Sequence, residues 1–139
     1  MMVTEFLQCR VPFLSGLTDE QVQALSAQTE QKSFKGGQTI LFKGTTVDGL
    51  GVVAEGAVAV WAVIKKGQAP AQVARLGPGE VFGETSIIEM STAGATVRAA
   101  EEGALVFTIP QEAFRGVLAQ NAELQARVTA LIAARKKQD

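Results

Sequence analysis

The sequence contains no histidine and a single cysteine, Cys9, among its 139 residues. Without histidine, the imidazole base of Ser/His/Asp and Cys/His catalytic relays is excluded, and so is the commonest metal ligand. With one cysteine, neither a Cys/His zinc site nor an intrachain disulfide can form, which agrees with a reducing compartment. No close pair of acidic residues stands out as an acid–base pair. We therefore predict that the protein is not an enzyme and holds no metal.

The sequence also lacks long apolar runs and an excess of charge of one sign. Its longest apolar run, residues 50–64, is interrupted by Glu55 and Gly56 and is shorter than the roughly 18 residues of a membrane span. We interpret this run as two buried strands around a turn. Thirteen basic and fourteen acidic residues give a net charge of -1, so no global field attracts nucleic acid. The N-terminus has no basic region before an apolar stretch, so we expect a cytoplasmic protein without a membrane segment.

The chain divides into three parts within one predicted domain, residues 1–139. Residues 1–30 contain Thr18 and Gln21 at the spacing of a capping box, which predicts that a helix begins after Thr18 with Val22 and Leu25 facing inward. Residues 31–109 contain short β-branched and aromatic runs separated by glycine-rich breaks, which predicts an all-β barrel or roll. These runs are residues 38–42, 50–54, 57–64, 71–76, 95–99 and 104–109.

Residues 110–139 return to helical spacing after Pro110, with Asn121 as a plausible cap between two helices. The second helix carries an apolar stripe at the i, i+4, i+7 and i+8 offsets, formed by Leu124, Val128, Leu131 and Ile132. The basic cluster Arg135, Lys136 and Lys137 lies in its last turn, where cations interact favourably with the helix dipole. We interpret that cluster as a solvated helix end and expect no direct binding of nucleic acid.

The ordered set of motifs resembles the cyclic-nucleotide-binding domain family, which includes catabolite-activator-type regulators, protein kinase regulatory subunits and nucleotide-gated channels. The segments that carry the resemblance are "FLQCRVPFLSGLTDEQVQAL", "FKGGQTILFKGTTVDGLGVVAEGAVAV", "LGPGEVFGETSII", "ATVRA" and "LVFTIPQEAF". The resemblance covers Phe6 to about Ala134. It implies a mainly β fold: a β jelly-roll barrel with an N-terminal helix and two C-terminal helices.

The resemblance also implies a ligand site, because the family's segment beginning Phe-Gly-Glu is its phosphate-binding cassette. Gly83 allows the backbone to approach a ligand, and a short helix starting near Glu84 would direct its amides toward a phosphate. Glu84 can accept a hydrogen bond from a ribose 2'-hydroxyl. The cassette residues implied here are Phe82, Gly83, Glu84, Thr85, Ser86, Ala93, Gly94, Ala95 and Thr96. The implied ligand is a cyclic nucleotide, cAMP or cGMP.

The sequence departs from the family at the position of the phosphate-binding arginine, which is Ala93 here, and at Gly51, where an aromatic is usual. Removing one partner of such a charge pair typically costs about 2 to 5 kcal/mol, or roughly one and a half to three and a half decades of affinity. The candidate compensating cation is Arg75, which could reach across the barrel. Arg98 follows Val97 in a strand and should point to the opposite face.

We consider three functions for a chain with these features. The first is a regulatory module with a degenerate cassette that acts by protein interaction or by binding a non-standard ligand. The second is a functioning cyclic-nucleotide sensor that relies on Glu84 and cassette amides. The third is a transcription regulator, which we do not expect, because activator-type relatives continue into a helix-turn-helix domain and this sequence stops at Asp139.

In the family that the sequence resembles, ligand binding moves the last helix against the barrel. Here the stripe from Leu124 to Ile132 would be the moving face, or it would pack permanently on the barrel, or it would pair with a protein partner or a second copy of the chain.

Overall fold

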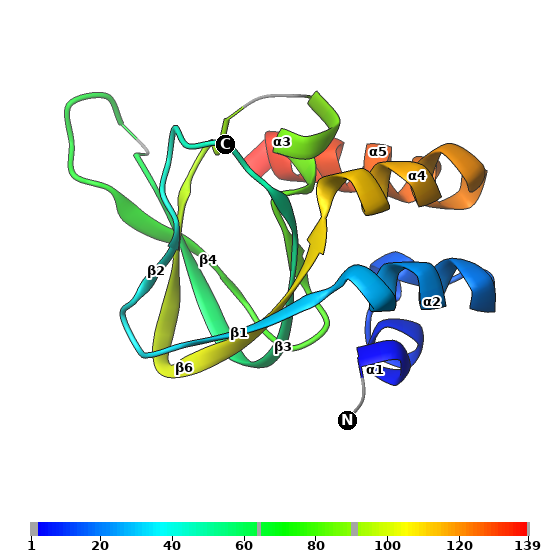
Figure 1. Ribbon diagram of the computed structural model, residues 1–139. Coiled ribbons are helices and arrows are strands. Elements are labelled where there is room, and N and C mark those ends of the chain that lie inside the picture. Colours follow the sequence, from blue (N-terminus) through cyan, green and yellow to red (C-terminus); the bar gives the residue numbers. More distant parts are fainter. Residues whose placement is uncertain (1–2, 64, 90–91, 139) are drawn as a thin grey trace.

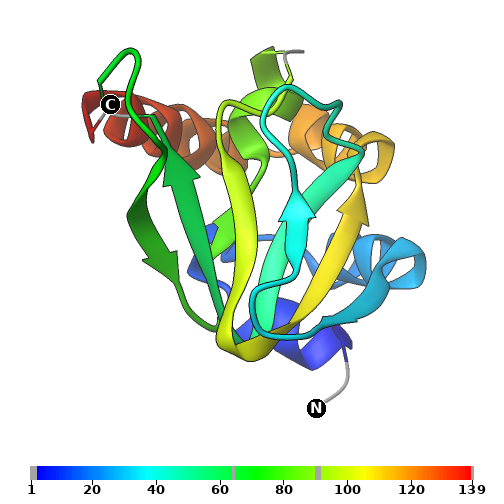
Figure 2. The ribbon, with the colours of Figure 1, turned by 90° about the vertical axis from the view of Figure 1, so that its left-hand side faces the viewer.

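The structure is a computed structural model that describes residues 3–63, 65–89 and 92–138, with the backbone only for residues 85, 88, 89 and 135–138. Helices gather on one side of a barrel of strands (Figure 1), and the strands stand in front of the helices in the perpendicular view (Figure 2). The helices are α1 (Val3–Cys9), the 3-10 helix η1 (Pro12–Leu14), α2 (Asp19–Gln28), α3 (Glu84–Glu89), α4 (Gln111–Gln120) and α5 (Ala122–Gln138). The strands are β1 (Glu30–Phe34), β2 (Thr39–Leu41), β3 (Gly49–Ala62), β4 (Ala71–Leu76), β5 (Val81–Phe82) and β6 (Thr96–Pro110).

Two long antiparallel strands form the centre of the sheet. β3 and β6 pair from Gly49 opposite Pro110 to Trp61 opposite Thr96. β1 and β2 pair with β6 on one side, while β4 and β5 pair with β3 on the other. The predicted mainly β fold with flanking helices is therefore confirmed.

The prediction of two strands around a turn in residues 50–64 is wrong, because β3 continues through that stretch. The register between β3 and β6 shifts between Val53 and Glu55 and again between Gly56 and Val58. Gly56 has φ of 72°, a left-handed conformation that glycine adopts without steric cost. Bulges of this kind bend a strand without ending it, and the same holds for β6 at Gly103, which has φ of 82°.

Two short strands were not predicted from the sequence. In β1 only Phe34 is even half-buried, so the alternation that marks a strand is absent. β1 is held instead by its ladder to β6, in which Lys32 lies opposite Val106. β5 is only two residues long and pairs with β3. Pairing with a distant segment, rather than a local pattern, determines both strands.

Both predicted helix caps are confirmed. The Thr18 hydroxyl accepts from the Gln21 amide at 3.1 Å, and the Gln21 side chain accepts from the Thr18 amide at 3.1 Å, which completes the capping box. Val22 and Leu25 of this helix are buried as predicted. At the junction of α4 and α5, the Asn121 side-chain oxygen accepts from the Leu124 amide at 3.0 Å.

The apolar core has two parts. One lies between the helices and the barrel and includes Leu7, Leu25, Leu50, Phe107, Phe114 and Leu124. The other lies among the strands and comprises Val53, Val58, Leu76, Phe82, Val97, Ala99, Ala104 and Val106. Within the described residues, no helix combines the length and apolar character needed to cross a membrane.

Candidate ligand-binding site

The first half of the cassette is a turn from β5 into α3. Gly83 makes this turn with φ of 90°, in the left-handed region where a side chain is strained. A Cβ added there would lie 3.1 Å from Cγ1 of Val47 and 3.3 Å from the carbonyl oxygen of Gly49. Glycine is therefore required for the close approach of this turn to the start of β3.

The start of α3 places polar residues in the interior. Glu84 is only 1% exposed, which is unusual for a carboxylate, and Ser86 is 9% exposed. The Ser86 hydroxyl donates to the carbonyl oxygen of Thr92 at 3.1 Å, so it ties α3 to the segment that follows it. The side chain of Thr85 lies outside the described part of the structure.

Phe82, the first cassette residue, explains the departure at Gly51. The two residues lie opposite each other in the β3–β5 ladder, and Phe82 belongs to the core among the strands. A Cβ added to Gly51 would overlap the ring carbons of Phe82. The aromatic ring that the family usually has at position 51 could not coexist with this ring, so the glycine makes room for Phe82.

The second half of the cassette begins at Ala93, the position of the missing arginine. Ala93 is 4% exposed and belongs to the core between helices and barrel, together with Val47. Its amide donates to the carbonyl oxygen of Thr45 at 2.9 Å, and its carbonyl accepts from the Gly44 amide at 2.8 Å. The loop before β3 thus fixes the backbone of Ala93 on both sides.

The remaining cassette residues lie nearer the surface. Gly94 is exposed, and a Cβ added to it would meet open space. Ala95 and Thr96 are half-buried, and the Thr96 hydroxyl oxygen accepts from the Lys43 amide at 3.2 Å. The fold therefore brings together the two halves of the predicted cassette on either side of residues 90 and 91, which are outside the described part.

The candidate cations have partners on the outer surface of the sheet. Arg75 is exposed and donates to the Glu102 carboxylate at 2.5 Å. This hydrogen bond, followed by one from the Glu102 backbone, holds the pKa of Glu102 below its ordinary value. Arg98 is exposed, with its guanidinium 5.3 Å from the centre of the Trp61 ring, while Val97 is buried as the alternation predicted. The structure does not bring Arg75 together with the cassette.

A contact that the sequence did not suggest links α3 to α4. The Arg115 guanidinium donates to the backbone carbonyl of Ile87, which is 1% exposed. Arg115 is itself half-buried and follows Phe114, which is fully buried in the helical core. From the sequence, an arginine at this position of an amphipathic helix is indistinguishable from an ordinary surface charge. Its contact with α3 can be recognised only from the packing of α4 on that helix.

The apolar stripe of α5 packs against its own chain. Leu124 and Val128 are 0% and 2% exposed and belong to the helical core, and Leu131 and Ile132 pack against it. Leu124 and Val128 are therefore covered by the rest of the chain in this structure, whereas Leu131 and Ile132 are only half-buried.

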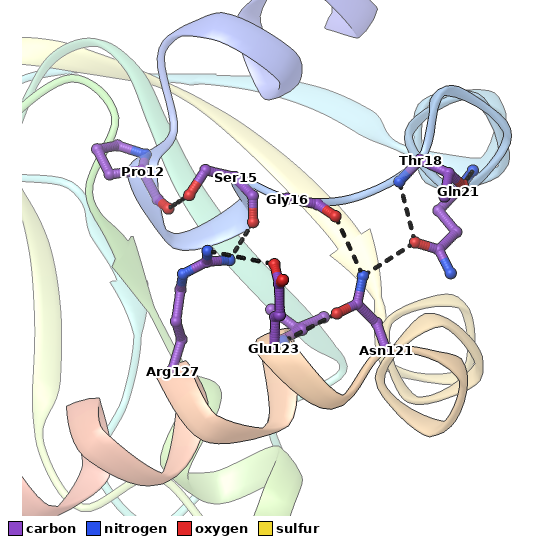
Figure 3. A network of polar contacts seen from close by, with 9 residues as sticks. Pro12, Ser15, Gly16, Thr18, Gln21, Asn121, Glu123 and Arg127 are labelled. Carbon is purple, nitrogen blue, oxygen red and sulfur yellow. Dashed lines mark hydrogen bonds and ion pairs between the residues drawn. The ribbon is translucent and has the colours of Figure 1, made fainter.

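A polar network also fixes the start of α5 to the N-terminal segment (Figure 3). The Asn121 side-chain amide donates to Gln21 Oε1 at 3.1 Å and to the Gly16 carbonyl at 3.5 Å. Arg127 donates to the carbonyl of Ser15 and lies 3.9 Å from the Glu123 carboxylate. The capping box of α2 therefore shares Gln21 with the junction of α4 and α5.

The surface of the described residues carries hollows on its helical side. One of about 450 Å³ is lined by α1, α2 and β1, and another of about 290 Å³ is lined by α4 and α5, including Arg115. Neither is lined by a cassette residue. Among the described residues, no cluster of three or more aspartate, glutamate or cysteine side chains is arranged to hold a metal ion.

Comparison with known proteins identifies the family that the sequence motifs resemble. The sequence model of the family described as "Cyclic nucleotide-binding domain" matches residues 31–121. The cyclic AMP receptor protein of Thermus thermophilus is 30% identical over 95 residues, which cover 68% of this chain and 44% of that protein. The type II regulatory subunit of cAMP-dependent protein kinase from Drosophila melanogaster is 29% identical over 89 residues, covering 64% of this chain and 23% of that protein. The matched part thus spans less than half of either curated relative.

Solved structures share the fold over nearly the whole chain. The regulatory domain of Toxoplasma gondii PKA, solved with cAMP, has a TM-score of 0.83 at 22% identity and covers 99% of this chain and 49% of that one. The sensor domain of the transcriptional regulator DNR from Pseudomonas aeruginosa has a TM-score of 0.79 at 17% identity, covering 95% of this chain and 91% of that one. At these identities the likeness shows the fold alone.

Proposed function

Because the chain belongs to the cyclic nucleotide-binding domain family, we propose that it is a non-enzymatic regulatory module whose cassette is degenerate. In this proposal it acts by protein interaction or by binding a ligand other than the usual cyclic nucleotides. The family and the regulatory character of its relatives support a regulatory role, and the absence of histidine removes the usual base of an enzyme.

The observation that carries the proposal is the environment of Ala93. Its methyl group belongs to an apolar core with Val47. The family motif has at this position the arginine whose guanidinium binds the phosphate. A bidentate guanidinium contact is one that few other side chains reproduce. The two candidate arginines, Arg75 and Arg98, contact Glu102 and Trp61 on the outer surface. The Ser86 hydroxyl already donates to the Thr92 carbonyl, so its proton is not available to a phosphate. The Thr96 hydroxyl accepts from the Lys43 amide and keeps its proton, but a neutral donor does not replace a full positive charge.

The second candidate function is a working cyclic-nucleotide sensor. The buried Glu84 and the left-handed turn at Gly83 favour it, because together they retain the ribose acceptor and the close backbone approach. In this case the cassette amides would have to hold the phosphate without a full positive charge.

Calorimetric titration with cAMP and cGMP separates the two functions. We expect the unaltered chain to bind neither nucleotide below millimolar concentration. Ala93→Arg should raise the affinity by roughly 30-fold to 3,000-fold if the rest of the pocket is open. Glu84→Gln in the Ala93→Arg background is the matched control and should weaken that binding.

Micromolar binding of cAMP or cGMP by the unaltered chain would overturn the proposal in favour of the sensor. If Ala93→Arg folds normally by circular dichroism and still binds no nucleotide, the pocket is closed and the degenerate cassette is supported further.

A further inference from the structure

Exposed apolar residues come from the loop after β2, from the end of β3 and from β4. The large hydrophobic side chains exposed among the described residues are Phe42 at 61%, Val63 at 39% and Val73 at 45%. The loop containing Phe42 and the β3–β4 hairpin containing Val63 lie at the same end of the barrel in both views (Figures 1 and 2).

Strand register explains this proximity. Leu41 lies opposite Val97, Val97 opposite Val60, and Val60 opposite Ala74. These pairs form one row across β2, β6, β3 and β4. Phe42 and Val73 therefore lie next to the two ends of a four-strand row, about 14 Å apart at a strand spacing of roughly 4.8 Å.

The same end carries positive charge. Lys43 follows Phe42, and Lys65 and Lys66 lie in the hairpin after Val63; all three lysines are exposed. Arg98 and Trp61 lie between the two loops and contact each other at 5.3 Å. Among the described residues, the loop of residues 42–47 and the hairpin residues 61–63 and 65–72 contain no aspartate or glutamate. We call Phe42, Val63, Val73, Lys43, Lys65 and Lys66 the rim surface.

We propose that the rim surface binds an extended acidic segment of a partner protein that also carries apolar side chains. This inference rests on the proposed role in protein interaction and names the chemistry of the partner. The exposed lysines complement carboxylates, and exposed valine and phenylalanine complement apolar side chains. An extended chain of about four or five residues spans the row, at roughly 3.3 Å per residue.

Other anionic partners fit the rim surface less well. A flat bilayer would touch only the tips of the loops. Arg98 lies further from the tips, because it pairs with Ala59 and Thr39, one residue beyond the row that contains Val97. Nucleic-acid affinity comes mainly from basic side chains on phosphates, of which the rim surface has three, and valines offer no stacking face to a base. An acidic peptide can lie along the outer face of these strands and contact the exposed Phe42 and Val73 as well.

The test uses Trp61, the single tryptophan, as an intrinsic probe. A peptide of about 12 residues alternating glutamate and leucine is titrated into the whole chain, with its glutamine-for-glutamate version as the peptide control. We expect the acidic peptide to change Trp61 fluorescence and to bind at least about 10-fold more tightly than the neutral one, with the difference shrinking as salt is added.

Variants localise the binding. The double variant Lys65→Glu with Lys66→Glu should weaken binding of the acidic peptide by about 10-fold or more. The matched control is Lys32→Glu with Lys35→Glu, which makes the same change in net charge near β1 and should alter binding less than about 2-fold.

The proposal fails if both double variants lose binding equally or if the neutral peptide binds as well as the acidic one. Tighter binding to phosphatidylserine vesicles or to single-stranded oligodeoxythymidine than to the peptide would replace the partner class. These outcomes do not depend on cyclic-nucleotide titration, so they separate failure of this inference from failure of the proposed function.

Discussion

Arg115 on α4 donates to the backbone carbonyl of Ile87 in α3, so one side chain ties the cassette helix to the C-terminal helices. The acceptor belongs to a residue that is 1% exposed and packs in the helical core. Any change in the position of α3 therefore has to break or carry along this hydrogen bond. Arg115 therefore holds the position of α3 relative to α4.

Replacing Arg115 should loosen α3 specifically. Arg115→Met keeps much of the apolar stem but leaves the Ile87 carbonyl without this charged donor, so we expect a loss of about 1.5 to 3 kcal/mol in the free energy of unfolding. Hydrogen exchange of the amides in residues 84–89 should become faster, and Arg115→Lys should restore part of the protection. Arg127→Met, which removes an arginine-to-carbonyl bond away from α3, is the control and should leave exchange in α3 unchanged.

Gly51 and Phe82 should be energetically coupled. Gly51→Ala places a methyl group against the Phe82 ring. This overpacking should lower the free energy of unfolding by about 1 to 3 kcal/mol. Combined with Phe82→Leu, the loss should be smaller than the sum of the single losses by about 0.5 to 3 kcal/mol. Denaturant unfolding measures each value. Gly94→Ala, where the added methyl group meets open space, should cost nothing, and additive losses at Gly51 and Phe82 would contradict this packing.

Asn121 has two roles that substitutions can separate. Asn121→Asp keeps an oxygen to cap the Leu124 amide but loses the donations to Gly16 and Gln21. Asn121→Ala loses the cap as well, which typically costs about 0.5 to 2 kcal/mol. The midpoint temperature of thermal unfolding should be highest for the unaltered chain, lower for Asn121→Asp and lowest for Asn121→Ala. Equal stability of the two variants would mean that the cap contributes nothing.

The ion pair of Arg75 and Glu102 should be visible in acid. Because Arg75 lowers the pKa of Glu102 from 4.5 in the folded chain, its contribution to stability is present above pH 4.5 and is lost as the pH falls through the lowered value. In Arg75→Gln, an NMR titration should show the Glu102 pKa rising toward 4.5. Arg98→Gln is the matched control on the neighbouring strand. An unchanged Glu102 pKa in Arg75→Gln would contradict the pairing.

Local chemistry made several features predictable from the sequence. Thr18 and Gln21 satisfy each other within one helical turn, and Asn121 caps a helix through the Leu124 amide three residues later. The inward stripe of α5 follows from helical periodicity alone. In contrast, β1 has no apolar alternation, and the merging of two runs into β3 depends on Gly56 facing a bulge in β6. Such features need a partner strand that is distant in sequence.

The sequence by itself determined the family, the order of helix, barrel and helices, and the absence of arginine at position 93, because these depend on residue type and spacing along the chain. Only the tertiary structure decided that Arg75 pairs with Glu102, that Arg115 donates to Ile87, and that the loop after β2 and the β3–β4 hairpin share one end of the barrel. The two contacts join residues 27 and 28 positions apart, and all these relationships arise from strand register and helix packing, which no local pattern specifies.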